Sequence, residues 1–113
     1  MGVSTRVLGE EHPDTLVAMN NLAATLRMQG EYPGARGLEE RVLEVRTRVL
    51  GEEQPDTLRS MDNVAFTFDQ AGDREGAIQL TRRCVAGRRK VLGENHPDTI
   101  AAAEHLKKLE EQR

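Results

Sequence analysis

The sequence predicts an all-α protein, folded as a solenoid of antiparallel helix pairs with about five main helices. Three observations predict this fold class. A segment of 42 residues repeats along the chain. Apolar residues recur at helical spacing within each copy, and Gly and Pro occupy the positions where helices would end and begin. No stretch of the sequence has the alternating pattern of a strand.

The repeat is clearest where Val7–Leu16 recurs as Val49–Leu58 and again as Val91–Ile100. The spacing is 42 residues both times, without insertion or deletion. Residues 3–6 also resemble residues 45–48, so we expect the chain to open on the end of an earlier copy. We therefore expect a single domain over residues 1–113, made of two complete copies and one partial copy: 7–48, 49–90 and 91–113.

Copy one is predicted to form two helices, which we call helix A and helix B. Helix A opens at Pro13-Asp14-Thr15 and ends at Gly30, because glycine reaches left-handed dihedral angles at little steric cost. Helix B opens near Pro33, whose fixed φ suits a first helical turn, and ends near Gly51. The apolar faces of the two helices are Leu16, Met19, Leu22, Ala23 and Leu26, then Ala35, Leu38, Val42, Val45 and Val49.

The later copies repeat this pattern. In copy two, helix A ends at Gly72, and the two apolar faces are Leu58, Met61, Val64, Ala65 and Phe68, then Ala77, Leu80, Cys84 and Val85. The partial third copy supplies one helix, with an apolar face of Ile100, Ala103, Leu106 and Leu109. Lys107 and Glu110 replace the small and apolar residues of the earlier copies, so we expect 98–112 to be a polar-faced capping helix at the natural end of the array.

Composition excludes several classes of protein. The net charge is −3 and the only aromatic residues are Tyr32, Phe66 and Phe68, so a nucleic-acid platform of stacked rings in a basic field is not expected. No apolar run is long enough to span a membrane. The single cysteine, Cys84, cannot form an internal disulfide, which favours a reducing, cytoplasmic location.

No constellation typical of catalysis or metal binding is found in the sequence, so we predict a protein that is not an enzyme. The histidines His12, His96 and His105 have no Cys or His at ligand spacing, so neither a metal nor a cofactor is expected. Cys84 takes the place of Val42 on the apolar stripe of helix B, which favours packing over nucleophilic chemistry. The glycines of the helix B segments are scattered, unlike a phosphate-binding loop.

Charged residues concentrate on the helix B segments. Copy one carries Glu39, Glu40 and Glu44 there, and we expect the adjacent Glu39 and Glu40 on a solvated face. Copy two carries a basic cluster, for which two interpretations remain open: a solvated outer face, or a patch for an anion or acidic partner. The residues of this basic cluster are Arg82, Arg83, Arg88, Arg89 and Lys90.

The repeat resembles the tetratricopeptide repeat (TPR), in the 42-residue form of kinesin light chains and of the C-terminal arrays of fungal and bacterial NLR-like proteins. The matching residues are Asn20-Asn21-Leu22-Ala23, Gly30, Tyr32, Ala35 and Leu38 in copy one, and Asp62-Asn63-Val64-Ala65, Gly72, Ala77 and Leu80 in copy two. The resemblance covers essentially the whole chain. It implies a right-handed α-solenoid that acts as a protein-interaction scaffold.

In this family, ligands bind in a concave groove that the A helices line. Amides such as Asn21 and Asn63 donate and accept hydrogen bonds, which suits the backbone of an extended peptide. Phe66 is either an aromatic anchor for a partner or packs sideways on a neighbouring helix A. The resemblance carries the groove role to Asn20, Asn21, Arg27, Arg59, Asp62, Asn63, Phe66 and Asp69, and in the third copy to Ala101, Glu104, His105, Lys108, Glu111 and Gln112.

We therefore predict a module that binds a peptide or a helix of an unidentified protein partner in this groove. The Lys and Asn pattern that binds chaperone C-terminal tails in this family is missing, so that ligand is disfavoured. The alternative is a structural fragment of a longer array, which forms homo-oligomers through exposed apolar residues such as Val17 and Met28. Neither a nucleic acid nor a membrane is expected among the partners.

Overall fold

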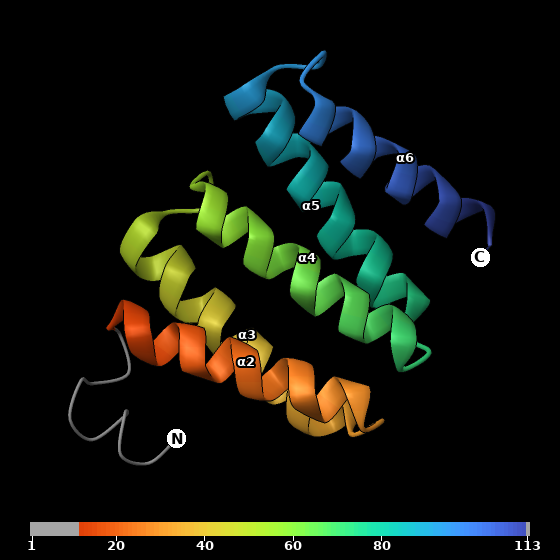
Figure 1. The fold of residues 1–113 in the computed structure, drawn as a ribbon. Helices are drawn as coiled ribbons and strands as arrows, with labels where there is room; N and C mark the ends of the chain where they lie inside the picture. The colour runs from red at the N-terminus through yellow and green to blue at the C-terminus, as the bar shows by residue number, and fades with distance from the viewer. Residues whose placement is uncertain (1–11, 113) are drawn as a thin grey trace.

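The computed structural model describes residues 12–112, which form five α-helices and no strand (Figure 1). The predicted all-α fold class is therefore confirmed over this range. The expected tail of an earlier copy, residues 3–6, lies outside the described residues. The helices are α2 (Pro13–Met28), α3 (Tyr32–Leu50), α4 (Pro55–Gln70), α5 (Arg74–Leu92) and α6 (Pro97–Glu111).

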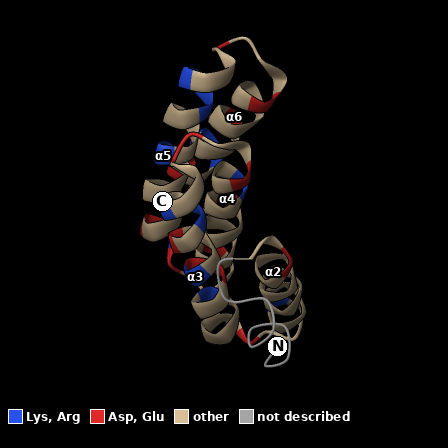
Figure 2. Ribbon diagram, turned by 90° about the vertical axis from the view of Figure 1, so that its left-hand side faces the viewer, with Lys and Arg blue, Asp and Glu red and all other residues tan. Residues whose placement is uncertain are grey.

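The helices stack in chain order, each packed against the next and running in the opposite direction (Figure 1). Viewed from the side, α2, α4 and α6 form one layer, and α3 and α5 form the other (Figure 2). The first layer holds the A helices of the three copies and the second holds the B helices. This two-layer arrangement is the predicted solenoid, and it brings equivalent positions of successive copies side by side.

Glycine and proline determine where the helices end and begin. Four glycines follow the ends of α2 to α5 with φ between 81° and 94°, a region that L side chains rarely adopt: Gly30, Gly51, Gly72 and Gly93. A proline lies in the first turn of α2, α3, α4 and α6. Two of these starts are capped, because Nδ1 of His12 and of His96 accepts a bond of 3.1 Å from the backbone N–H two residues later.

The core follows the predicted apolar stripes and runs between the two layers. Its small members lie where helices cross, and Ala23, Ala35, Ala65 and Ala77 are all buried. Cys84 is fully buried beside Leu58 and Met61, as its place on the stripe predicts. Because small side chains allow close approach of paired helices, a chain with few aromatic residues can still fill this core.

Glu39 is the clearest departure from the predicted pattern. We expected it on a solvated face beside Glu40, but its side chain is only 3% exposed, whereas Glu40 is exposed. It faces inward from α3 and pairs with Arg27 of α2, at 2.7 Å from Oε2 to Nη1. Burial of a carboxylate is tolerated here because a cation and a hydroxyl, that of Thr67, both bind it.

The outer face of α6 differs from the same face of α2 and α4. Ile100 is 45% exposed, whereas its counterparts Leu16 and Leu58 are buried. Lys107 is exposed, and Glu110 pairs with Arg82 of α5 at 2.6 Å. The helix is therefore mixed in character, with charged residues beside one open apolar position.

Candidate interaction groove

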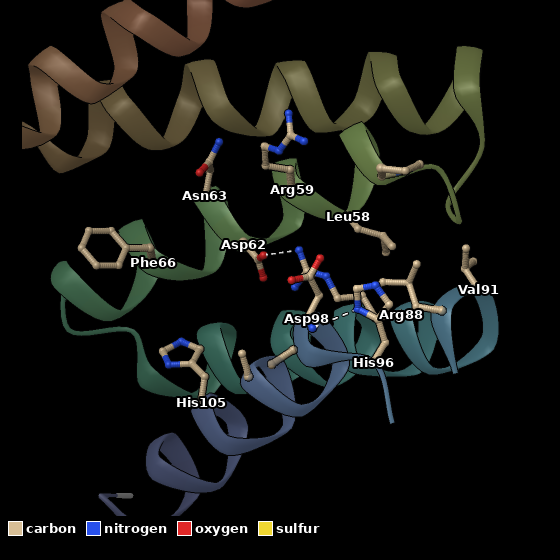
Figure 3. Close-up of a pocket in the computed structure, with 14 residues that line it drawn as sticks. Leu58, Arg59, Asp62, Asn63, Phe66, Arg88, Val91, His96, Asp98 and His105 are labelled. Carbon is tan, nitrogen blue, oxygen red and sulfur yellow. Dashed lines mark hydrogen bonds and ion pairs between the residues drawn. The ribbon is translucent and has the colours of Figure 1, made fainter. Parts of the chain in front are cut away.

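A pocket of about 650 Å³ lies between α4, the C-terminal end of α5 and the start of α6 (Figure 3). Helix α4 supplies one wall and α6 supplies the opposite wall, so the pocket spans the junction between two copies. Its lining consists of Pro55, Leu58, Arg59, Asp62, Asn63, Phe66, Arg88, Val91, Leu92, His96, Asp98, Ala101, Ala102 and His105. The two-layer fold creates this space because each helix B packs between successive A helices and holds them apart at this end.

The apolar part of the lining is unusually open to solvent. Phe66 is 46% exposed on α4, and Val91 and Leu92 are both exposed at the end of α5. The guanidinium of Arg27 lies over the Phe66 ring, with 4.9 Å between Cζ and the ring centroid. Phe66 therefore packs sideways against a residue of the neighbouring helix A, as one of the two alternatives predicts, while part of its ring stays open to solvent.

An ion pair forms the polar centre of the pocket. Figure 3 shows Asp62 pointing from α4 toward Arg88, with 2.7 Å between Oδ2 and Nη2. The buried thiol of Cys84 donates to the other carboxylate oxygen at 3.2 Å. Burial of Arg88 acts to lower its pKa, but the hydrogen bond that Arg88 donates to Asp62 and the charges around it raise the pKa above its usual value. The Asp62 carboxyl group thus accepts from two donors, Arg88 and Cys84.

The thiol of Cys84 has no nucleophilic character in this setting. Burial raises its pKa to about 12, and the adjacent Asp62 carboxylate adds to the shift. The thiol therefore remains protonated at neutral pH and serves as a hydrogen-bond donor.

Half of the predicted site residues line the pocket, and the other half lie outside its lining. Arg59, Asp62, Asn63 and Phe66 all line the pocket, together with Ala101 and His105 of the third copy. Asn20 and Asn21 lie on α2, away from this pocket. Arg27 pairs with Glu39, and Asp69 pairs with Arg74 at 3.0 Å, so both charges are used within the fold.

Sequence reasoning missed the residues that the end of α5 and the start of α6 contribute. Arg88, Val91 and Leu92 were assigned to helix B, and His96 and Asp98 to the turn and first helical turn. The repeat could have indicated them. The end of helix B is followed by the start of the next helix A at every junction between copies, so these two segments must lie close to each other.

The basic cluster of α5 does not form one continuous cationic surface. Arg83 and Lys90 bind the acidic turn before α4, at 2.6 Å from Glu52 and 2.7 Å from Glu53. Arg82 binds Glu110, and Arg89 lies 3.5 Å from Glu94. Assigning the whole cluster to a solvated outer face is wrong for Arg88, whose side chain is only 17% exposed and lines the pocket.

Two further kinds of site are absent from residues 12–112. This range contains no group of three or more His, Cys, Asp or Glu side chains that could hold a metal ion. None of its helices has the length and apolar content needed to cross a membrane.

The comparisons with known proteins agree with this architecture. One similar solved structure contains nearly identical TPR-like repeats from Podosopora anserina and is described as a kinesin light chain. It aligns with a TM-score of 0.87 and 27% identity. BtubC (BKLC) from P. vanneervenii aligns with a TM-score of 0.79 and 20% identity, which shows a shared fold. Each alignment covers 96% of this chain but only 51% and 44% of the two relatives, so the chain spans about half their length.

A family model identifies the repeat itself. No curated protein sequence matches the chain significantly. The tetratricopeptide repeat model, however, matches residues 15–56 and 57–98, two consecutive units with the 42-residue period found in the sequence. These units include α2 to α5 except for the first two residues of α2, and they cover well over half of the chain. The chain therefore belongs to the tetratricopeptide repeat family.

Proposed function

We propose that this chain, a protein-interaction repeat scaffold, binds an extended peptide or a helix of a partner protein in the pocket between α4 and α6. The observation that carries the proposal is Phe66, a large aromatic side chain left 46% exposed at the edge of a concave site. Exposed aromatic residues that line a pocket are frequent centres of binding energy. A cytoplasmic partner would fit the single reduced cysteine.

The pocket combines an apolar surface with polar groups for a peptide backbone. Phe66, Val91 and Leu92 offer area for one or two apolar side chains of a ligand. The Asn63 amide can donate to a backbone carbonyl and accept from a backbone N–H. Arg59 at the rim is largely exposed, and its pair with Asp56 at 3.3 Å is exposed as well, so its charge remains available to a ligand.

Selection from a phage-displayed random peptide library tests this proposal, with the selected peptide measured by calorimetry. Phe66→Ala should weaken its binding by about tenfold or more, as expected for a central aromatic contact. Met28→Ala is the matched control, because Met28 is 87% exposed on α2 and lies outside the pocket. Equal affinity of the wild type and Phe66→Ala for the selected peptide would contradict the assignment.

Self-association is the second candidate, and a different surface favours it. Ile100 on α6 and Val17 and Met28 on α2 are exposed apolar residues at the two ends of the stack. A second copy of the chain could cover them. Light scattering should then show a dimer that Ile100→Lys dissociates, and a monomer at high micromolar concentration would rule this candidate out.

A further inference from the structure

Arg46 and Arg88 occupy the same position in successive copies but point to different helices. Arg46 of α3 reaches forward to α4, where Nη1 lies 2.8 Å from Oγ of Ser60 and 3.4 Å from the carbonyl oxygen of Asp56. Arg88 of α5 reaches back to α4, to Asp62. In the first case the arginine binds the helix A that follows it, and in the second case it binds the helix A of its own copy.

Three positions around the arginine differ between the copies, and all three differences favour the second orientation. The backward acceptor is Asp62 in copy two but Asn20 in copy one, so only copy two offers a carboxylate. The forward acceptor is Ser60 after copy one but Ala102 after copy two, where no hydroxyl exists. A carboxylate binds guanidinium more strongly than an amide oxygen does, because both partners are charged.

The third difference fixes the carboxylate itself. Cys84 Sγ lies 3.2 Å from Oδ1 of Asp62, nearer than the 3.5 Å to the Leu58 carbonyl oxygen, and its bond to Oδ1 leaves Oδ2 for Arg88. The counterpart of Cys84 is Val42, which has no donor. Arg88 is also attracted toward α6, because the charge of Asp98 acts to raise the pKa of Arg88. The charge of Asp56 acts on the pKa of Arg46 in the same direction. Arg88 therefore pairs with Asp62 although the charge of Asp98 on α6 also attracts it.

We propose that Asp62, Cys84 and Ala102 act together as positioning residues, which turn Arg88 away from α6 and thereby open the pocket at this junction. In the forward orientation, the Arg88 side chain would cross from α5 to α6, through the space between Asp98 and Ala102 that now belongs to the pocket. Arg46 shows the result of such a crossing, since it is only 8% exposed between α3 and α4. The same arginine is thus buried between two helices at one junction and lines a pocket at the next.

The consequence for binding rests on the proposed function. If a peptide binds at the junction between α4 and α6, these three residues determine which junction of the array accepts it. The arginine itself is identical in both copies, so its presence in a sequence does not distinguish an open junction from a closed one. The distinction depends on the residues that accept its hydrogen bonds.

Crystal structures of two reciprocal variants test the proposal. The first variant gives copy two the residues of copy one: Asp62→Asn, Cys84→Val and Ala102→Ser. We expect the Arg88 guanidinium to bind the introduced hydroxyl and the Asp98 carbonyl, with loss of most of the pocket volume. The second variant makes the opposite change, with Asn20→Asp, Val42→Cys and Ser60→Ala. We expect Arg46 to turn back to α2 and to open a pocket between α2 and α4.

Either arginine keeping its present orientation in its variant would overturn the proposal. Ala102→Ser alone is a milder test should the triple variant fail to fold, and it should give Arg88 a second conformer directed at α6. The peptide selected on the wild type should bind the first variant about tenfold more weakly. If no peptide is selected, the proposed function fails, while the two crystal structures still decide the orientation of the arginines.

Discussion

Oε2 of Glu39 lies 2.7 Å from Nη1 of Arg27, and this ion pair joins α3 to α2. The Thr67 hydroxyl of α4 donates to the other oxygen of the same carboxylate, and Arg27 also reaches the Thr67 oxygen at 3.3 Å. The same arginine covers the ring of Phe66. A buried polar network therefore connects the packing of copy one to the rim of the pocket in copy two.

Glu39→Ala is expected to destabilise the fold by about 2–3 kcal/mol. The substitution leaves Arg27 without its carboxylate in a partly buried position, and removing one member of such a pair is costly. Glu40→Ala is the matched control, because the adjacent Glu40 forms an exposed pair with Arg36 that contributes only about 0.5 kcal/mol or less. Urea denaturation of both variants measures the difference, and equal losses would show that Glu39 is not held as described.

The Glu39 network should also give the fold a pH dependence. Burial raises the pKa of Glu39 above its usual value, although Thr67 and Arg27 act to lower it. The folded state then binds the proton more tightly than the unfolded state does. The contribution of this group to stability is therefore full below its unfolded pKa of 4.5 and is lost as the pH rises through the folded pKa.

Glu39→Gln removes this titration, so it isolates the pH effect. The free energy of unfolding of the wild type, relative to that of Glu39→Gln, should increase as the pH is lowered from 7 toward 4. Urea denaturation series at several pH values measure this difference, in which other carboxylates cancel. A difference that grows as the pH rises would contradict the assigned direction of the pKa shift.

Two glycines in the B helices should respond in opposite ways to alanine. A Cβ at Gly76 would lie 2.7 Å from Cδ2 of Phe68 and 2.6 Å from Oδ2 of Asp73, whereas a Cβ at Gly37 meets nothing within 4 Å. Gly76→Ala is therefore expected to cost about 1–3 kcal/mol through overpacking. Gly37→Ala should stabilise the fold by about 0.5–1 kcal/mol, because alanine favours the helix. Thermal denaturation of the two variants and the wild type measures these changes. A Gly76→Ala variant as stable as the wild type would contradict the close packing around Gly76.

Much of the fold could be predicted because the repeat contains helix A three times and helix B twice. The register of Gly51 and Pro55 recurs at Gly93 and Pro97, so a turn inferred once is supported again at the next copy. The burial of Glu39 could not be predicted in this way. Its counterpart in copy two is Thr81, so the repeat gives no second example of the carboxylate.

The pocket illustrates a second reason why sequence reasoning stops short. The A-helix positions Asp62 and Phe66 could be assigned to the groove from their place in the repeat. The role of Arg88 could not, because an identical arginine at position 46 points elsewhere. Side-chain orientation depends on which acceptors lie within reach across three helices, and the linear pattern does not contain that information.

The helix starts offer a paired test of capping. Nδ1 of His96 accepts from the Asp98 N–H at 3.1 Å, while Gln54, the equivalent residue before α4, makes no side-chain cap bond. His96→Ala is expected to destabilise the fold by about 1 kcal/mol, and Gln54→Ser to stabilise it by up to about 1 kcal/mol. Thermal denaturation at neutral pH measures both changes. Equal and small effects at the two positions would show that the histidine caps contribute nothing.

The Cys84 thiol should be unreactive toward thiol reagents while the chain is folded. Its pKa of about 12 leaves roughly one thiolate in ten thousand at pH 8, compared with about one in ten for an unfolded cysteine of pKa 9.0. The reaction with Ellman's reagent should therefore be about a thousandfold slower in buffer than in concentrated urea. Cys84→Val, which restores the residue of copy one, gives the baseline without thiol. Similar rates in buffer and in urea would mean that the thiol is open to solvent, and that it cannot be the buried donor that fixes the Asp62 carboxylate.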